Sequence, residues 1–165
     1  MKPVFGPSPI LAARQRARWC VALLLAAALG LGRAVPAGAV PPVCSVTATG
    51  LNFGVYRASN GPVAFTGDIR VQCSGGAATF TVALTAGSSG NIALRQMHAG
   101  NGAVLRYQLY LDAARTRPWG DGIIGGIAGP VTGTSVELTV YGLLFAGQHV
   151  PAGQVVDTVQ AILNY

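Results

Sequence analysis

The chain has 165 residues, of which 51% are hydrophobic in type and only 10% are charged, and it contains 23 glycines and 10 prolines. This composition excludes a disordered polyelectrolyte and a coiled coil, and the length is that of one globular domain. The formal charge of +6 does not indicate a nucleic-acid partner, because five of the eleven basic residues lie within the first 33 residues. The rest of the chain has six arginines against five carboxylates, so we expect no nucleic-acid binding.

The first forty residues have the order of a secretory signal peptide. Basic residues up to Arg18 precede an apolar stretch over residues 21–32, which is followed by Pro36 and by small residues at 37–39. This order is typical of export signals, and an apolar stretch of about a dozen residues is shorter than the roughly twenty that span a bilayer. A buried N-terminal helix is the alternative. We expect a signal peptide over residues 1–39, cleaved after Ala39, and one mature domain over residues 40–165.

Cysteine usage agrees with export. After removal of residues 1–39, Cys44 and Cys73 are the cysteines that remain, and an even pair in an exported chain favours a disulfide. Closing a loop of about thirty residues stabilises a fold by about 3 to 4 kcal/mol in the chain-entropy model. We expect no metal site, because zinc needs four ligands at short spacings and His98 and His149 are distant from each other and from both cysteines in the sequence.

Along the mature chain, apolar residues alternate with polar or small residues. A period of two predicts half-buried strands, and the clusters of Gly, Pro, Asn and Ser between the alternating runs predict turns. Short strands separated by Gly-rich turns favour an all-β sandwich or barrel of antiparallel sheets. The predicted strands cover residues 51–55, 69–73, 80–84, 105–111, 136–140 and 158–165.

The candidate catalytic motifs lack the context that their chemistry requires. Residues 120–125 match the letters of the dinucleotide-binding fingerprint, but that motif needs a strand before it and a helix after it. The five carboxylates are scattered singly, and His98 and His149 have no evident partner for acid–base work. We therefore expect no enzymatic activity, no cofactor and no small-molecule substrate.

Several short blocks follow one another in an order that is more specific than any one of them. They are Cys44–Tyr56, Gly67–Cys73, Leu105–Tyr110, Trp119-Gly120, Leu138–Gly142 with Ala146–Gln148, and Asp157–Val159. Together they resemble the spore coat U domain family over essentially all of residues 44–165. The resemblance implies an immunoglobulin-like antiparallel β-sandwich that lacks one strand, the missing strand being supplied in trans. It also implies a place among subunits of archaic, Csu-type chaperone-usher pili or related secreted coat proteins.

The same resemblance implies a set of partners. In such systems a periplasmic chaperone lends a strand to the subunit, and an outer-membrane usher exchanges that strand for the N-terminal extension of the next subunit. The expected partners are therefore a periplasmic chaperone, an outer-membrane usher and other pilus subunits. The expected location is the periplasm in transit and afterwards the cell surface, in a fimbria or outside the cell.

The alternating pattern at the C-terminus gives physical support to a sandwich that lacks one strand. The sequence ends inside an alternating run, so we expect an uncovered sheet edge and an apolar groove that a further strand would fill. The groove is expected between residues 46–55 and residues 159–165, with Ile162 on the opposite face. The side chains expected to line it are Leu51, Phe53, Val159, Ala161 and Leu163.

The segment ahead of Cys44 does not resemble a donor strand. A donor needs about ten residues of alternating apolar side chains, whereas cleavage after Ala39 leaves Val40-Pro41-Pro42-Val43, and proline lacks the N–H that strand pairing requires. We therefore expect a strand acceptor, as a terminal or minor subunit. The alternatives are a non-polymerising spore-coat or matrix protein, and a small secreted module that binds sugar or a surface through the loop around Trp119.

Overall fold

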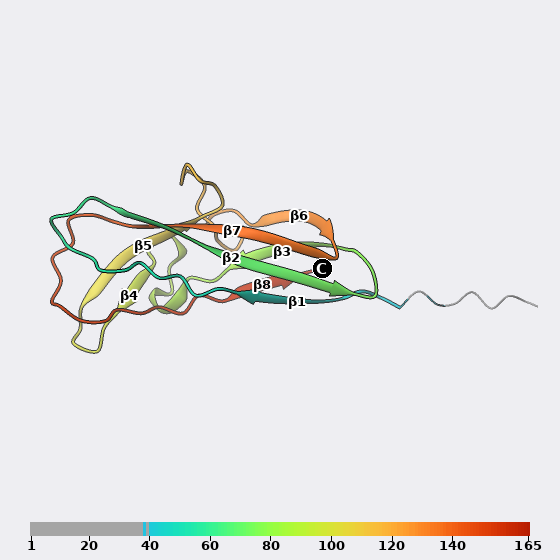
Figure 1. Ribbon diagram of the computed structural model, residues 1–165, viewed down its shortest axis with the longest axis horizontal. Coiled ribbons are helices and arrows are strands. Elements are labelled where there is room, and N and C mark those ends of the chain that lie inside the picture. Colours follow the sequence, from blue (N-terminus) through green and yellow to red (C-terminus); the bar gives the residue numbers. More distant parts are fainter. Residues whose placement is uncertain (1–37, 39) are drawn as a thin grey trace, which may run out of the picture. The chain divides into compact units, whose positions relative to one another are not determined.

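The computed structural model describes residue 38 and residues 40–165, so the signal peptide predicted over residues 1–39 lies outside the described part except for Gly38. The described residues form two antiparallel sheets packed as a sandwich (Figure 1), which confirms the all-β prediction. One sheet has the order β1-β2-β7-β5-β4 and the other the order β6-β3-β8. The strands are β1 Val43–Ala48, β2 Val63–Ser74, β3 Ala78–Leu84, β4 Gln96–His98, β5 Val104–Tyr110, β6 Ala128–Gly133, β7 Ser135–Leu144 and β8 Ala161–Asn164.

Helical structure in the described residues is confined to two 3₁₀ turns, η1 over Gly87–Ser89 and η2 over Ile92–Leu94, which connect β3 to β4. No helix in this part of the chain is long and apolar enough to cross a membrane.

The predicted strands agree with the observed ones in the central strands and differ at the two ends, and β4 and β6 were not predicted. β2, β3 and β7 contain the alternating runs predicted for them, and β5 contains residues 105–110 of the run predicted over residues 105–111. Residues 51–55 are not in a strand. There, the side chain of Asn52 accepts a hydrogen bond from the backbone N–H of Gly54, whose φ is +68°. Such a local turn competes with strand pairing, so the first strand ends at Ala48. β8 likewise covers only part of the run predicted over residues 158–165.

The core lies between the sheets and consists of the inward-facing residues of the central strands. Trp119 anchors it from a loop: its side chain is buried, and the indole N–H donates to the carbonyl of Val82 over 2.9 Å. Gly142 leaves room for the ring of Phe65 on the neighbouring strand, because a Cβ at this position would overlap that ring. The fully buried core side chains include Leu109, Leu144, Val71 and Val82.

The outer edges of the two sheets differ in how they are protected. β6 carries Pro130, and β4 has only three residues and pairs through His98 with Val156. β1 and β8 have neither device, and within the described residues no strand pairs with the outer edge of either. These two edge strands belong to different sheets and contact each other along one side of the sandwich (Figure 1). Natural proteins protect an exposed edge unless something is to pair with it.

Candidate functional site

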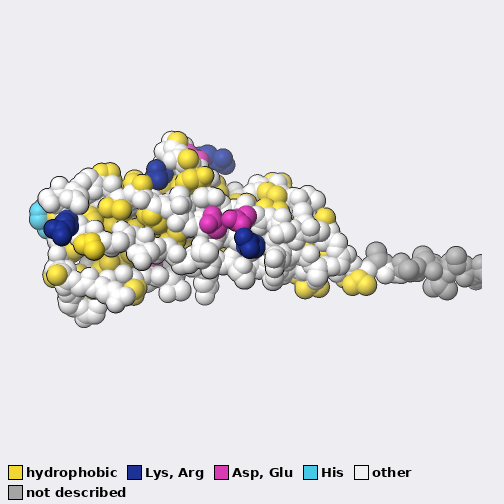
Figure 2. All heavy atoms as spheres, in the orientation of Figure 1, with side chains coloured by type: hydrophobic (Ala, Val, Ile, Leu, Met, Phe, Trp, Pro, Cys, Tyr) yellow, Lys and Arg dark blue, Asp and Glu magenta, His cyan; other side chains and the backbone are white. Residues whose placement is uncertain are grey.

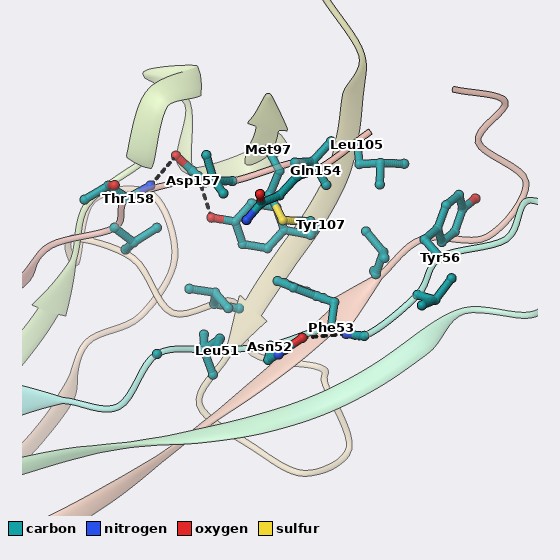
Figure 3. Close-up of a pocket in the computed structure, with 18 of the residues that line it drawn as sticks. Leu51, Asn52, Phe53, Tyr56, Met97, Leu105, Tyr107, Gln154, Asp157 and Thr158 are labelled. Carbon is teal, nitrogen blue, oxygen red and sulfur yellow. Dashed lines mark hydrogen bonds between the residues drawn. The ribbon is translucent and has the colours of Figure 1, made fainter. Parts of the chain in front are cut away.

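An apolar groove opens into the core on the side of β1 and β8. It has a volume of about 1180 Å³ and lies between residues 48–58 and residues 148–161 (Figure 3). Its floor consists of core side chains from β3, β5 and β7, and apolar side chains are visible at the surface of this part of the domain (Figure 2). The floor includes Leu84, Leu105, Leu109, Val140 and Leu144.

The first wall of the groove is the segment that continues β1, residues 49–58. The start of this segment is fixed by Thr49, whose backbone N–H donates to the carbonyl of Asp68 over 2.9 Å. Leu51 packs over Gly67 of β2, where a Cβ would overlap the leucine side chain. The ring of Phe53 lies 3.7 Å from that of Phe65, measured between centroids. This wall therefore presents apolar side chains to the groove although it is not a strand.

The second wall is the segment that leads into β8, residues 150–161. Its partly buried residues alternate with exposed ones, as in a strand that has one face toward the core. Gln160 and Ile162 lie on the outer face and are exposed. The inward positions are Val155, Asp157, Val159, Ala161 and Leu163.

Four of the five side chains predicted for the groove line it: Leu51, Phe53, Val159 and Ala161. The fifth, Leu163, does not line this groove. It packs against the same core further along β8, where it pairs with Val82 of β3. That these residues receive a partner strand is a proposal.

The backbone of both edge strands has hydrogen-bonding groups that face the groove side. Residues of an antiparallel pair alternate between hydrogen-bonded and non-hydrogen-bonded positions. Because Thr49 donates to β2, the alternation turns the N–H and C=O groups of Cys44, Val46 and Ala48 toward the open edge. By the same reasoning, the bond from Thr85 N–H to the Gln160 carbonyl turns those of Ala161 and Leu163 outward. The side chains of Cys44, Val46, Ala161 and Leu163 pack against the core, so an added strand would meet backbone groups and apolar side chains together.

The disulfide ties the first edge strand to its neighbour. Cys44 and Cys73 are directly paired in the register of β1 and β2 and are bonded to each other, with their Cα atoms 4.0 Å apart. This is a non-hydrogen-bonded position, where side chains of facing residues come closest. The bond therefore fixes the position of β1 at the edge of the groove.

A carboxylate interrupts the apolar face of the second wall. The Asp157 carboxylate accepts hydrogen bonds from the Tyr107 hydroxyl at 2.5 Å (Figure 3) and from the backbone N–H of Ser88 at 2.8 Å. It also accepts bonds from the Ser88 hydroxyl and from the backbone N–H of Thr158. Burial raises the pKa of Asp157, but these hydrogen bonds outweigh burial and lower that pKa overall. Burial and the bond to Asp157 raise the pKa of Tyr107.

The first wall is joined to Gln148, just ahead of the second wall, at the end of the groove that is away from β8. The backbone N–H of Gln148 donates to the hydroxyl of Tyr56 over 2.7 Å. The side-chain amide of Gln148 bonds in turn to both backbone groups of Arg106 on β5.

Sequence reasoning missed the polar groups at the walls. Asp157 did leave a signal, because it is the one charged residue on the inward-facing positions 155, 157, 159, 161 and 163. Tyr56 and Gln148 left none, since their pairing depends on the tertiary fold. Tyr56 and Gln148 each lie within a block that resembles the family, but the resemblance does not say what their side chains contact.

The residues considered for catalysis are not gathered into a site. Within residues 40–165, no group of three or more His, Cys, Asp or Glu side chains comes together. His98 is on β4 and His149 is exposed in the loop after β7. Residues 120–125 form a loop in which Asp121 accepts hydrogen bonds from the backbone N–H groups of Ile123 and Ile124, and no helix follows it. The fingerprint letters therefore have a local structural role in turning the chain.

A family model and a known relative both match most of this chain. The family model described as Spore Coat Protein U domain matches residues 35–162, and thus starts ahead of the predicted cleavage site. Protein U of Myxococcus xanthus is 34% identical over 130 residues, which are 70% of this chain and 71% of that protein.

Among solved structures, the fold is similar to a chain of the CsuC–CsuE chaperone–tip adhesion subunit pre-assembly complex from the archaic chaperone-usher Csu pili of Acinetobacter baumannii. The TM-score is 0.54 at 24% identity, and the match covers 76% of this chain. The chain spans only 40% of that solved chain, so the likeness is one of fold.

Proposed function

The chain belongs to the spore coat protein U domain family, and we propose that it is an exported structural subunit of a surface pilus whose open groove accepts a β-strand from a partner. The observation that carries the proposal is the groove between residues 48–58 and residues 148–161, where the apolar core is open to solvent next to the unprotected edges of β1 and β8. We propose no catalytic activity and no cofactor for the domain.

The free energy of strand addition would come from two sources. Apolar side chains at every second position of the added strand would cover the floor of the groove, which stabilises by about 25 cal/mol per Å² of apolar surface removed from water. Its N–H and C=O groups would pair with those that Val46 and Ala161 turn outward. An edge strand that pairs with a partner is thereby protected from non-specific aggregation.

The partners follow from the same proposal. A periplasmic chaperone would fill the groove first, and a second subunit would replace it at an outer-membrane usher. The fold likeness to a chain of a complex between a chaperone and a pilus subunit supports a chaperone as the first partner. The proposed route is export directed by residues 1–39, passage through the periplasm, and assembly at the cell surface.

We propose further that this subunit accepts a strand and does not donate one through residues 40–43. Pro41 and Pro42 lack the N–H groups of a donor strand. The carbonyls of Val40 and Pro41 lie beside Gly75, at the turn between β2 and β3, so this segment packs against its own domain. A subunit of this kind would be terminal or minor in a fibre.

A second candidate function is a coat or matrix protein that does not polymerise by strand exchange, and the match to the family described as Spore Coat Protein U domain favours it. The two candidates differ in what fills the groove. A sugar-binding or surface-binding module that uses the loop around Trp119 is not favoured, because the side chain of Trp119 is buried in the core.

The test of strand acceptance uses the purified exported chain and a synthetic peptide of about ten residues with an apolar side chain at every second position. The isolated chain is expected to melt at low temperature or to aggregate, and the peptide is expected to raise its melting temperature. A peptide with the same composition in scrambled order is the control. A chain that is a stable monomer with the same melting temperature in both peptides would refute strand acceptance and leave the coat-protein candidate.

A further inference from the structure

We propose that Asp157 is a positioning residue that holds the second wall of the groove open and in place before a strand arrives. The inference rests on the proposed function, since it concerns how the same groove becomes ready to bind. It is carried by the position of the carboxylate, which faces inward on an otherwise apolar wall and bonds to two other parts of the fold.

The wall has few other attachments where it crosses the groove. Residues 150–155 are in no strand of the described chain. The carbonyl of Ala152 accepts a hydrogen bond from the side chain of Asn101, and Val156 exchanges two backbone hydrogen bonds with His98 on β4. Gln160 bonds to Thr85 just ahead of the regular pairing with β3, which begins at Ala161. The carboxylate of Asp157 lies between the attachments at Val156 and Gln160, so it fixes residues 157–159, whose backbone pairs with neither sheet.

The fold around the carboxylate is shaped to receive it. Gly87, in η1, has a φ of +71°, and a Cβ at this position would overlap the carboxylate of Asp157. A glycine is therefore required here both for the left-handed backbone and for the close approach. The next residue, Ser88, donates to the carboxylate through its backbone N–H and its hydroxyl.

Tyr107 connects this wall to the opposite one across the floor. Its hydroxyl bonds to Asp157 on the second wall, and its ring makes an edge-on contact with the ring of Phe53 on the first wall, at 5.6 Å between centroids (Figure 3). One side chain of β5 thus contacts both walls. The rate of strand binding is proportional to the fraction of molecules in which the groove is already open. Loss of this link should lower that fraction and slow binding.

The ionised carboxylate of Asp157 supports a fixed geometry. Burial raises its pKa, but the hydrogen bonds from Tyr107, Ser88 and Thr158 outweigh burial and favour the charged form. The wall is therefore held by a charge-assisted network, in which each hydrogen bond is stronger than one between neutral groups.

The experiment compares Tyr107→Phe and Asp157→Asn with the unchanged chain, using the same ten-residue peptide as the probe. Tyr107→Phe removes one hydroxyl and keeps the ring that contacts Phe53. Tyr141→Phe is the matched control, since Tyr141 lies on the outer face of β7, away from the groove. Peptide association and dissociation rates are measured by stopped-flow fluorescence, and amide hydrogen exchange is measured at Val156 and Thr158 in the free chain.

We expect both groove variants to slow peptide association by about tenfold, because loss of a hydrogen bond to a charged group lowers the population of the binding-competent wall. We expect the dissociation rate to change less than the association rate and exchange at Val156 and Thr158 to become faster. Tyr141→Phe should change none of these. Faster association in the variants would mean that Asp157 closes the groove, and unchanged exchange would mean that it does not hold the wall; either result overturns the inference.

Failure of the proposed function would give a different result from failure of the inference on Asp157. If no peptide binds to the unchanged chain, strand acceptance fails, while hydrogen exchange in Tyr107→Phe still decides whether Asp157 holds the wall. If Asp157→Asn does not fold, Tyr107→Phe and Ser88→Ala each remove a single hydroxyl from the network and take its place.

Discussion

The hydroxyl of Tyr56 accepts a hydrogen bond from the backbone N–H of Gln148 at 2.7 Å, which joins two segments that are 92 residues apart in the sequence. This bond closes one end of a groove that is otherwise open between its walls. Gln148 also bonds to both backbone groups of Arg106 and thereby takes the place of a strand neighbour on β5. A strand entering the groove would have to stop here or break this contact.

We predict that Tyr56→Phe loosens this end of the groove without unfolding the domain. Loss of one partly buried hydrogen bond should cost about 1 kcal/mol of stability, and it should leave the Gln148 N–H without its partner. The amide of Gln148 should exchange faster with solvent, while the amides of the central strands β2 and β7 keep their protection. Equal loss of protection throughout both sheets would show that the contact supports the whole fold and not one end of the groove.

The disulfide gives a second prediction. Cys44 and Cys73 close a loop with a sequence separation of 29 and hold the edge strand β1 beside β2. The double variant Cys44→Ser with Cys73→Ser should lose about 3 kcal/mol of stability, because the unfolded chain is then no longer constrained. The urea midpoint of the oxidised chain, measured against the double variant, tests this.

Two results would contradict it. Peptide mapping under non-reducing conditions that found both thiols free would remove the premise. An unchanged urea midpoint in the double variant would show that β1 is held by pairing with β2 alone.

The sequence predicted the parts of the molecule that depend on local alternation. The inward faces of the central strands follow from the period of two, and Leu51 and Phe53 face the groove as expected although a turn at Asn52 keeps them out of a strand. In these cases the pattern of apolar residues decides which face is buried, whatever the hydrogen bonding.

The polar contacts at the groove could not be predicted in the same way. Asp157 bonds to Tyr107, 50 residues away, and to Ser88, 69 residues away. Such contacts depend on how the two sheets are placed relative to each other, which alternation does not specify. A charged residue at an inward position is the signal that the sequence offers, and it indicates that a partner exists without identifying it.

The carboxylate of Asp157 makes stability depend on pH. Its pKa is lower in the folded chain than the ordinary value of about 3.9, so the ionised form contributes stability that is fully present above that value and is lost as the pH falls through the folded pKa. Chains with Asp157 and with Asp157→Asn should therefore differ by a constant amount in free energy of unfolding above about pH 5, and the difference should shrink below about pH 4.

Urea unfolding of both chains between pH 3 and pH 7 measures this difference directly. Asp112 and Asp121 also have lowered pKa values in the folded chain, but they are the same in both proteins and cancel in the comparison. A difference that grows toward acid pH would mean that the carboxylate destabilises the fold when ionised, contrary to the hydrogen bonds that it accepts.

The final prediction concerns the face of β8 that would meet an added strand. Ala161 lines the groove and is partly buried, whereas Ile162, its neighbour in sequence, has 44% of its surface exposed on the outer face. A charge at residue 161 would have to be buried beneath the added strand, which is unfavourable without a partner. A charge at residue 162 would stay in water. Ala161→Asp should therefore abolish the rise in melting temperature that the synthetic peptide causes, and Ile162→Asp should preserve it.

Each variant is compared with itself with and without peptide, so a lower starting stability does not affect the measured rise in melting temperature. Gln160→Asp, on the same outer face as Ile162, should behave like Ile162→Asp, and Leu163→Asp should behave like Ala161→Asp. Rescue of Ala161→Asp to the same extent as Ile162→Asp would show that the added strand does not cover this face of β8.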